Sequence, residues 1–373
     1  MPPRAVAALP LVLLLSAPLP PRAQAVVEVP DAPACARCRI VFERVATLGG
    51  ADDPESPGYD VTVERDRAGR FYVAPVVGRD GIAVYAPDGR FLRKIGRKGE
   101  GPGEFGFVLE ARVGPGDSLY VSDLAPRRLT VLAPGGGAVV RTSPLLGETR
   151  SFVLGRGGEL LAHASIATAA RAGYPLHRLS PRGEVLRSFG ADAAGVMRPD
   201  RPADGFRVIA PARGGNLWSA PINRYRIELW DPREGRLLKT LVRRTDWFPD
   251  WHVLPRGYPD LARPVTAVEG IREDASGLLW VFLRTADARW TAAPRPRDPS
   301  RERGVVPMAE LHRYLDTVVE VIDPVRGRLV ATGRAARHYE AVSLNGTGLV
   351  HSRREGADGV ELLDVWEVKL INP

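Results

Sequence analysis

The side chains of this sequence that could act as acids, bases or anion ligands recur at equivalent positions of a repeated pattern of strands and turns. Charged residues start the first strand of most copies, and polar residues end the second strand in two of them. The strand starts hold Glu110, Arg150, Arg207, Glu269 and Glu340, and the strand ends hold Asp123 and His163. Because equivalent positions of stacked repeats lie on one face, we predict that these residues line a single polar opening, here called the channel mouth.

A metal ion at this opening would need convergent oxygen ligands for calcium, or histidine and carboxylate ligands for zinc. The three glutamates of the channel mouth are balanced by its two arginines, and His163 and His351 are out of phase by one residue. This composition is typical of a compensated polar channel, so we expect no cofactor and no catalysis. The alternative is a metal-dependent lyase or lactonase that holds one divalent cation, calcium or zinc, at the channel mouth.

Two long insertions, 243–267 and 284–316, interrupt the repeats and by repeat phase emerge on the same face. Their aromatic and basic residues are Trp247, Trp251, His252, Tyr258, Trp290, Arg295 and Arg297. Long loops on a rigid scaffold are a usual place for binding, and indole rings beside arginines can hold a protein segment, a glycan or a small ligand. We predict a ligand-binding face here. The alternative is that these aromatics only pack the insertions onto the scaffold.

The only cysteines, Cys35 and Cys38, form a CARC motif near the N-terminus. A haem attachment site would need His where Arg39 stands, and no second ligand pair for zinc follows in the sequence. A close cysteine pair outside the cytoplasm usually oxidises. We therefore predict a local disulfide.

The elements that must position these residues are short strands joined by glycine turns. In the stretch 66–105 the turns at Gly69 and Gly89 separate runs rich in aromatic and β-branched residues, which is typical of hairpins. Six looser copies of this pattern begin near residues 61, 109, 151, 206, 268 and 339. The last copy lacks its fourth strand, and an orphan strand, 40–48, precedes the first. We predict an all-β, six-bladed β-propeller of four-stranded antiparallel blades, closed by the N-terminal strand completing the last blade.

Three stretches carry a resemblance to a known family. The segment DGRFLRKIGRKGEGPGEFG (88–106) resembles the exit of NHL-type six-bladed propellers, particularly exported bacterial members of unassigned activity. The segment LYVSDLAPRRLTVLAPGG (119–136) is similar to the NHL strand pattern, and IREDASGLLW (271–280) is similar to repeats of sensor propellers. The resemblance implies a repeat architecture and leaves the chemistry open.

The N-terminal residues predict export. Arg4, an apolar run and Ala23-Gln24-Ala25 are typical of a signal peptide, 1–25, cleaved near Ala25. We assign 26–39 to an N-terminal tail and 40–373 to a single propeller domain, without a membrane span. The net charge of +8 comes mainly from scattered arginines, so we expect no nucleic acid partner. The sequence thus predicts a periplasmic or secreted monomer.

Overall fold

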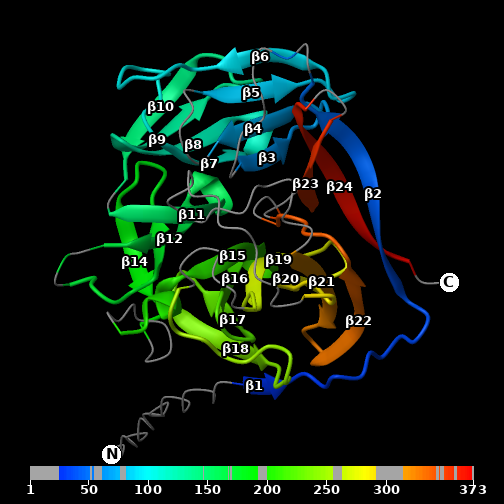
Figure 1. The fold of residues 1–373 in the computed structure, drawn as a ribbon. Coiled ribbons are helices and arrows are strands. Elements are labelled where there is room, and N and C mark those ends of the chain that lie inside the picture. Colours follow the sequence, from blue (N-terminus) through cyan, green and yellow to red (C-terminus); the bar gives the residue numbers. More distant parts are fainter. Residues whose placement is uncertain are drawn as a thin grey trace, which may run out of the picture.

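The computed structural model describes residues 25–50, 53, 61–75, 81–145, 147–166, 168, 170–191, 200–254, 263–290, 314–341, 344, 348–356 and 359–371. Within these ranges the chain forms six small sheets that stand as blades around a common axis (Figure 1). The prediction of an all-β, six-bladed propeller is confirmed. No helix of the described ranges is long and apolar enough to cross a membrane.

Blades 1 to 3 each contain four consecutive antiparallel strands, which follow one another outward from the axis. Blade 1 consists of β3 (Val61–Arg65), β4 (Phe71–Pro75), β5 (Ile82–Tyr85) and β6 (Phe91–Ile95). Blade 2 consists of β7 (Val108–Val113), β8 (Leu119–Leu124), β9 (Arg127–Leu132) and β10 (Val139–Pro144). Blade 3 consists of β11 (Glu148–Leu154), β12 (Leu160–Ser165), β13 (Leu176–Leu179) and β14 (Val185–Phe189). The short 3-10 helices of the chain are η1 (Pro115–Asp117), η2 (Arg156–Gly158), η3 (Pro202–Gly205) and η4 (Arg213–Gly215).

Blades 4 and 5 follow the same plan, and long connections leave each of them. Blade 4 consists of β15 (Arg207–Ala212), β16 (Asn216–Pro221), β17 (Arg226–Asp231) and β18 (Arg236–Val242). Blade 5 consists of β19 (Ala267–Glu273), β20 (Leu279–Ala286), β21 (Leu315–Asp323) and β22 (Arg328–Ala335). The two predicted insertions therefore fall between β18 and β19 and between β20 and β21.

Blade 6 is completed by the N-terminal part of the chain, as predicted. Its ladder consists of β23 (Leu349–Glu355), β24 (Glu361–Ile371) and β2 (Arg39–Leu48). The antiparallel pairing of β2 with β24 brings the first and last strands of the propeller side by side (Figure 1). The innermost position of this blade is held by a single bridge between Glu340 and His351. The ring is thereby closed, which removes two exposed sheet edges.

The segment assigned to an N-terminal tail lies along the outer edges of two blades. Strand β1 (Ala25–Glu28) pairs in parallel with β18 and adds a fifth strand to blade 4. Beyond it, the Cys35 amide donates to the carbonyl oxygen of Val330 in blade 5 at 3.0 Å. Cys35 and Cys38 are joined by a disulfide at this edge. The sequence analysis missed β1 because four residues carry too little pattern to be read as a strand.

The hydrophobic core is divided among the interfaces between successive blades. Each interface holds one cluster of buried apolar side chains, for example Tyr72 and Phe105 between blades 1 and 2, or Leu161 and Ile209 between blades 3 and 4. Blade packing in a propeller buries both faces of every sheet. Polar side chains inside such an interface must therefore find partners within the protein.

An aspartate orders the first turn of blade 1. Asp66 accepts hydrogen bonds from the Arg70 amide at 2.9 Å and from the Tyr72 hydroxyl at 2.9 Å, and Gly69 takes a φ of 82° in the turn. Asp274 repeats this arrangement in blade 5, where Trp280 Nε1 donates to its Oδ2 at 2.8 Å. The spacing Asp-x-x-Gly-x-x-aromatic thus explains why these turns form where they do.

We expect Asp66→Ala to lower the free energy of unfolding by about 1 to 3 kcal/mol, because it leaves the buried Tyr72 hydroxyl without an acceptor. Urea unfolding of the variant checks this. Asp66→Ala combined with Tyr72→Phe should lose less than the two single changes together, and simple additivity would contradict the proposed bond.

Candidate functional site

Three innermost strands contain a β-bulge near the end where the channel mouth is predicted. The register shifts fall between Val108 and Glu110 in β7, between Thr149 and Ser151 in β11, and between Val268 and Gly270 in β19. The extra residues are therefore Leu109, Arg150 and Glu269. A bulge releases its extra residue from the ladder and re-aims the side chain. Arg150 and Glu269 are equivalent in this sense, whereas Glu110 is offset by one residue.

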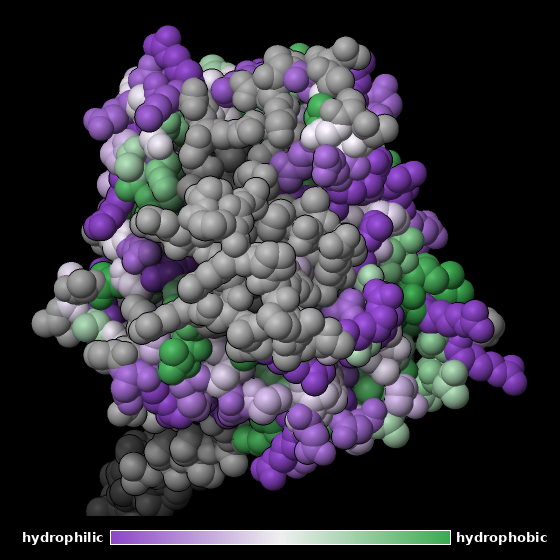
Figure 2. All heavy atoms as spheres, in the orientation of Figure 1, coloured by the Kyte–Doolittle hydropathy of each residue, from purple (hydrophilic) through white to green (hydrophobic). Residues whose placement is uncertain are grey.

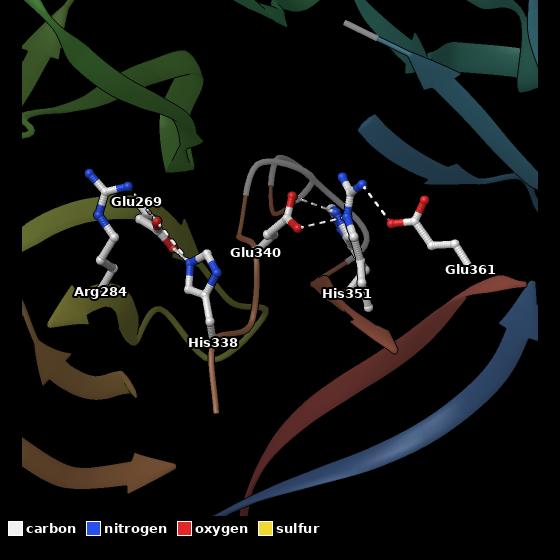
Figure 3. A network of polar contacts seen from close by, with 7 residues as sticks. Glu269, Arg284, His338, Glu340, His351 and Glu361 are labelled. Atoms are coloured by element: carbon white, nitrogen blue, oxygen red, sulfur yellow. Dashed lines mark hydrogen bonds and ion pairs between the residues drawn. The ribbon is translucent and has the colours of Figure 1, made fainter. Parts of the chain in front are cut away.

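Glu269 meets His338 and Arg284 where blade 5 adjoins blade 6 (Figure 3). His338 Nε2 lies 3.0 Å from each carboxylate oxygen of Glu269, and Arg284 Nη1 lies 3.5 Å from Oε1. Burial acts to lower the pKa of His338, but the carboxylates of Glu269 and Glu340 outweigh it and raise this pKa. Burial acts to raise the pKa of Glu269, and His338 and Arg284 reverse it to a lowered value. The pair is therefore a largely buried ion pair, with side chains that are 9% and 15% exposed.

Glu340 is held in a second cluster on blade 6. His351 Nε2 lies 3.1 Å from Glu340 Oε2, and Arg353 Nε donates to Oε1 at 3.0 Å. Arg353 also reaches Glu361, with 3.4 Å between Nη1 and Oε1. Burial opposes ionisation of Glu340, but His351 and Arg353 hold its pKa well below the usual range. Figure 3 shows the two clusters facing each other across the blade boundary.

A close backbone approach joins these clusters. A Cβ added at Gly270 would lie 2.8 Å from the carbonyl oxygen of Ala341, so glycine is required for blade 6 to pack this closely on β19. The structure thus brings together Glu269 and Glu340 of the predicted channel mouth. In the ranges that the structure covers, no group of three His, Cys, Asp or Glu side chains is arranged to hold a metal ion.

Glu110 lies in a separate, buried ion triad. Arg112 Nη1 donates to Glu64 Oε1 at 2.6 Å, and Arg112 Nη2 donates to Glu110. The other oxygen of Glu110 accepts from the Phe152 amide of blade 3 at 2.8 Å. Burial raises the pKa of Glu110 to about 7, although Arg112 and the Phe152 amide act to lower it. These contacts link blades 1, 2 and 3, and they occupy both carboxylate oxygens.

Asp123 orders the backbone where blade 1 passes into blade 2. Its Oδ1 accepts from the Phe107 amide at 2.7 Å and its Oδ2 from the Gly106 amide at 3.0 Å. Arg128 adds an ion pair at 3.7 Å. The side chain is fully buried, so it stabilises the connection between the blades and does not contact solvent.

Arg150, His163 and Arg207 lie together where blade 3 adjoins blade 4. Arg150 stacks on the Phe206 ring with 4.3 Å between its guanidinium carbon and the ring centroid. His163 Nε2 lies 2.9 Å from the carbonyl oxygen of Gly205. Arg150 and Arg207 both act electrostatically on His163. Three residues of the predicted channel mouth, two of them arginines, are therefore grouped at this blade boundary.

The loop after blade 4 is anchored by two of its aromatic side chains. Phe248 is buried in the core between blades 4 and 5, and Trp251 packs against the same cluster. Trp251 Nε1 donates to the carbonyl oxygen of Thr266 at 2.7 Å, and Thr266 Oγ1 donates to the carbonyl oxygen of Trp247 at 3.1 Å. Trp247 remains 39% exposed. Of the predicted binding aromatics, Trp251 thus packs the loop and Trp247 faces solvent.

The same loop is also held by a buried carboxylate, that of Asp204. Its Oδ1 lies 2.9 Å from His252 Nδ1, 2.6 Å from Asn223 Nδ2 and 2.8 Å from Arg224 Nη2. Burial acts to raise the pKa of Asp204, and bonds from His252, Asn223 and Arg224 lower it. The Nε2 atom of His252 contacts the Arg201 guanidinium. His252 therefore sits between a carboxylate and an arginine and is 31% exposed at its side chain.

The second insertion is described only at its ends. Trp290 packs on Tyr314, with 5.7 Å between ring centroids. This contact holds the two ends of the insertion together. Tyr258, Arg295 and Arg297 lie outside the described residues.

The sequence analysis missed Asp204, His338 and Arg353. Asp204 and His338 lie in connections between blades, which a strand-based repeat alignment leaves out. Arg353 lies two residues beyond His351 on β23 and therefore on the same face of the strand, which is the one signal that would have linked it to Glu340.

Neither a protein-family model nor a curated protein matches the chain. A solved structure from Bacteroides fragilis, described as an exported protein, is similar over 92% of this chain and 100% of its own, with 11% identity and a TM-score of 0.58. Virginiamycin B lyase from Staphylococcus aureus is similar over 88% of this chain and 99% of its own, with 9% identity and a TM-score of 0.44. A gluconolactonase from Xanthomonas campestris is similar over 90% of this chain and 91% of its own, with 13% identity and a TM-score of 0.46.

At such low identities, a structural similarity is one of fold alone. The chain therefore shares its propeller fold with a protein that is described as exported, and membership of the NHL family stays a prediction.

Proposed function

We propose that this chain is an exported propeller that binds a protein segment through the face around the blade 4 loop, without catalysis. The observation that carries the proposal is the exposure of Trp247 on a loop whose neighbouring side chains are anchored in the core. Val253 on the same loop is 67% exposed, while Phe248 and Trp251 fix the loop to the core. A large apolar side chain held rigidly in solvent favours binding, because little conformational entropy is lost on contact.

The chemistry around the loop favours an acidic protein segment with an apolar anchor. Arg201 is 38% exposed at its side chain and contacts His252 beside the loop, and the chain carries a net charge of +8. Trp and Arg are the side chains that most often dominate protein interfaces. In the view of Figure 2, the described apolar side chains gather in small groups among hydrophilic ones. A partner on such a surface would rely on a few anchors rather than on a broad apolar patch.

We expect Trp247→Ala to abolish capture of a partner from the extracytoplasmic fraction of the producing cells. The control is Leu186→Ser on blade 3, an apolar residue of similar exposure, 48%, which should leave capture unchanged. A peptide from the captured partner should then bind the native protein and lose at least about tenfold in affinity towards the variant, as for an interface hot spot. Equal capture by native protein and Trp247→Ala would show that the face is wrong. If no protein is captured but a glycan or small ligand binds in a Trp247-dependent way, the partner is that glycan or ligand and not a protein segment.

A second candidate is a metal-dependent lyase or lactonase at the channel mouth. It is favoured by the convergence of Glu269 and Glu340, but each carboxylate is already paired with a cation that a metal ion would have to displace. Stoichiometric calcium or zinc in the purified protein, lost in a Glu269→Gln and Glu340→Gln variant, would support this candidate over binding alone.

A further inference from the structure

A polar seam lies inside the interface between blades 3 and 4, and it is buried, unlike the exposed part of the blade 4 loop proposed above as a binding face. His163 shares a strand face with Leu161, and Arg207 shares one with Ile209, because successive side chains of a strand alternate. Leu161 and Ile209 belong to the single apolar cluster between these blades. His163 and Arg207 therefore point into the same interface. His163 is 2% exposed and the side chain of Arg207 is fully buried.

One edge of the Arg207 guanidinium has no hydrogen-bond partner among the described residues. Nη1 donates to Glu228 Oε2 at 2.7 Å and to Ser219 Oγ at 3.2 Å. Nε and Nη2 are buried, and no described residue accepts from them. These two nitrogens form the side-on edge of the guanidinium, the fork that binds the two oxygens of a carboxylate. Two buried donors without hydrogen bonds lower the stability of the folded protein, so we expect an acceptor at this edge of the guanidinium.

His163 offers the opposite kind of group in the same interface. Burial, with the charges of Arg207 and Arg150, lowers the pKa of His163 to about 3, so the ring is neutral. Its Nε2 lies against the Gly205 carbonyl oxygen and must carry the proton, which leaves Nδ1 as an acceptor. Nδ1 is buried and has no partner, and neither has the hydroxyl of Ser151, which is directly opposite His163 in the sheet.

The charge of the seam favours an anion. Glu228 pairs with both Arg207 and Arg226, the second at 2.6 Å between Nε and Oε1. Arg207 therefore shares the carboxylate of Glu228 with a second guanidinium group. A fully buried guanidinium is stabilised by a further anion at its open edge.

We propose that this seam, formed by Ser151, His163 and Arg207, binds a small α-hydroxycarboxylate. The carboxylate accepts from Nε and Nη2 of Arg207. The hydroxyl donates to Nδ1 of His163, and the Ser151 hydroxyl is free to bond either group. This site is independent of the protein-binding face, and either proposal can fail without the other.

The test is calorimetric titration of the purified protein with sodium glycolate and with sodium acetate, at one ionic strength and neutral pH. Both ions offer a carboxylate, and only glycolate carries the hydroxyl. We expect glycolate to bind about threefold to tenfold more tightly than acetate, as one neutral hydrogen bond allows. Absence of binding by both ions would mean that buried water satisfies these atoms, and it would overturn the proposal.

Two variants separate the roles of the fork and the ring. Arg207→Met should abolish binding of both ions. His163→Gln keeps an Nε2 donor for Gly205 but removes Nδ1, so it should bind glycolate and acetate equally while staying folded. Arg226→Gln is the matched control, because it touches the same Glu228 without reaching the fork, and it should keep the glycolate preference. If Arg207→Met does not fold, the His163→Gln result decides alone, and an unchanged preference for glycolate in that variant contradicts the proposal.

Discussion

Arg112→Met is expected to lower the free energy of unfolding by about 3 to 5 kcal/mol at neutral pH, the usual cost of leaving buried charge unpaired. Arg112 pairs with two carboxylates, those of Glu64 and Glu110, and all three side chains are 4% exposed. Its loss would leave two like charges in one interior, so at least one carboxyl would have to take up a proton. Urea unfolding of the native and variant proteins measures the difference.

The pH dependence of this loss follows from the raised pKa of Glu110. A carboxyl whose folded pKa is about 7, against an ordinary 4.5, contributes to stability in its protonated form below 4.5 and loses that contribution as the pH rises through 7. Without Arg112 the pKa values of both carboxyls rise further. The deficit of Arg112→Met should therefore be larger at pH 8 than at pH 5. A triple variant that also replaces Glu64 and Glu110 by Gln should recover part of the loss, and an equal deficit at both pH values would contradict the buried-triad account.

The propeller could be predicted from the sequence because its blades are built from local signals. Glycine turns such as Gly69, and the aspartate–aromatic pairs Asp66–Tyr72 and Asp274–Trp280, act within a few residues and repeat along the chain. The strand that closes the ring was predictable, because one extra strand precedes the first copy of the repeat and one strand is missing from the last copy. Strand β1 was not predictable, since its parallel pairing with β18 depends on a contact more than two hundred residues away in the chain.

The site was less predictable because it depends on single-residue register and on irregular connections. Glu110 and Glu269 were predicted to be equivalent, but the bulges make Leu109 the residue that is equivalent to Glu269. A shift of one residue moves a side chain to the other face of a strand, and this is why Glu110 serves an interior triad. The partners His338 and Asp204 lie in connections whose conformation follows no period.

The connection between blades 5 and 6 contributes to closure of the ring of blades. In the described residues of blade 6, the innermost position holds a bridge in place of a ladder strand, so we expect side-chain contacts to add to the stability of this position. The ion pair of His338 with Glu269, and that of Arg353 with Glu340, lie on either side of this bridge. Glu269 and Glu340, two residues of the predicted channel mouth, therefore take part in joining blades 5 and 6.

His338→Leu is expected to lower the free energy of unfolding by about 3 to 5 kcal/mol in mildly acidic solution, because it leaves Glu269 buried with only the longer Arg284 contact. The raised pKa of His338 means that its contribution is complete below 6.5 and is lost as the pH rises through the raised value. The lowered pKa of Glu269 means that its contribution is complete above 4.5 and is lost as the pH falls through the lowered value. The difference between native and variant proteins should therefore be largest between pH 4.5 and 6.5.

His338→Gln is the matched control, since it keeps one donor for Glu269 and carries no charge. We expect its deficit in urea unfolding to be smaller than that of His338→Leu and to vary less with pH, because only the charged ring titrates in this window. If both variants lose the same free energy at every pH, the charge of His338 contributes nothing, and packing alone joins blades 5 and 6. A deficit that follows the protonation of the imidazole would instead show that the ion pair of His338 with Glu269 helps to hold blades 5 and 6 together.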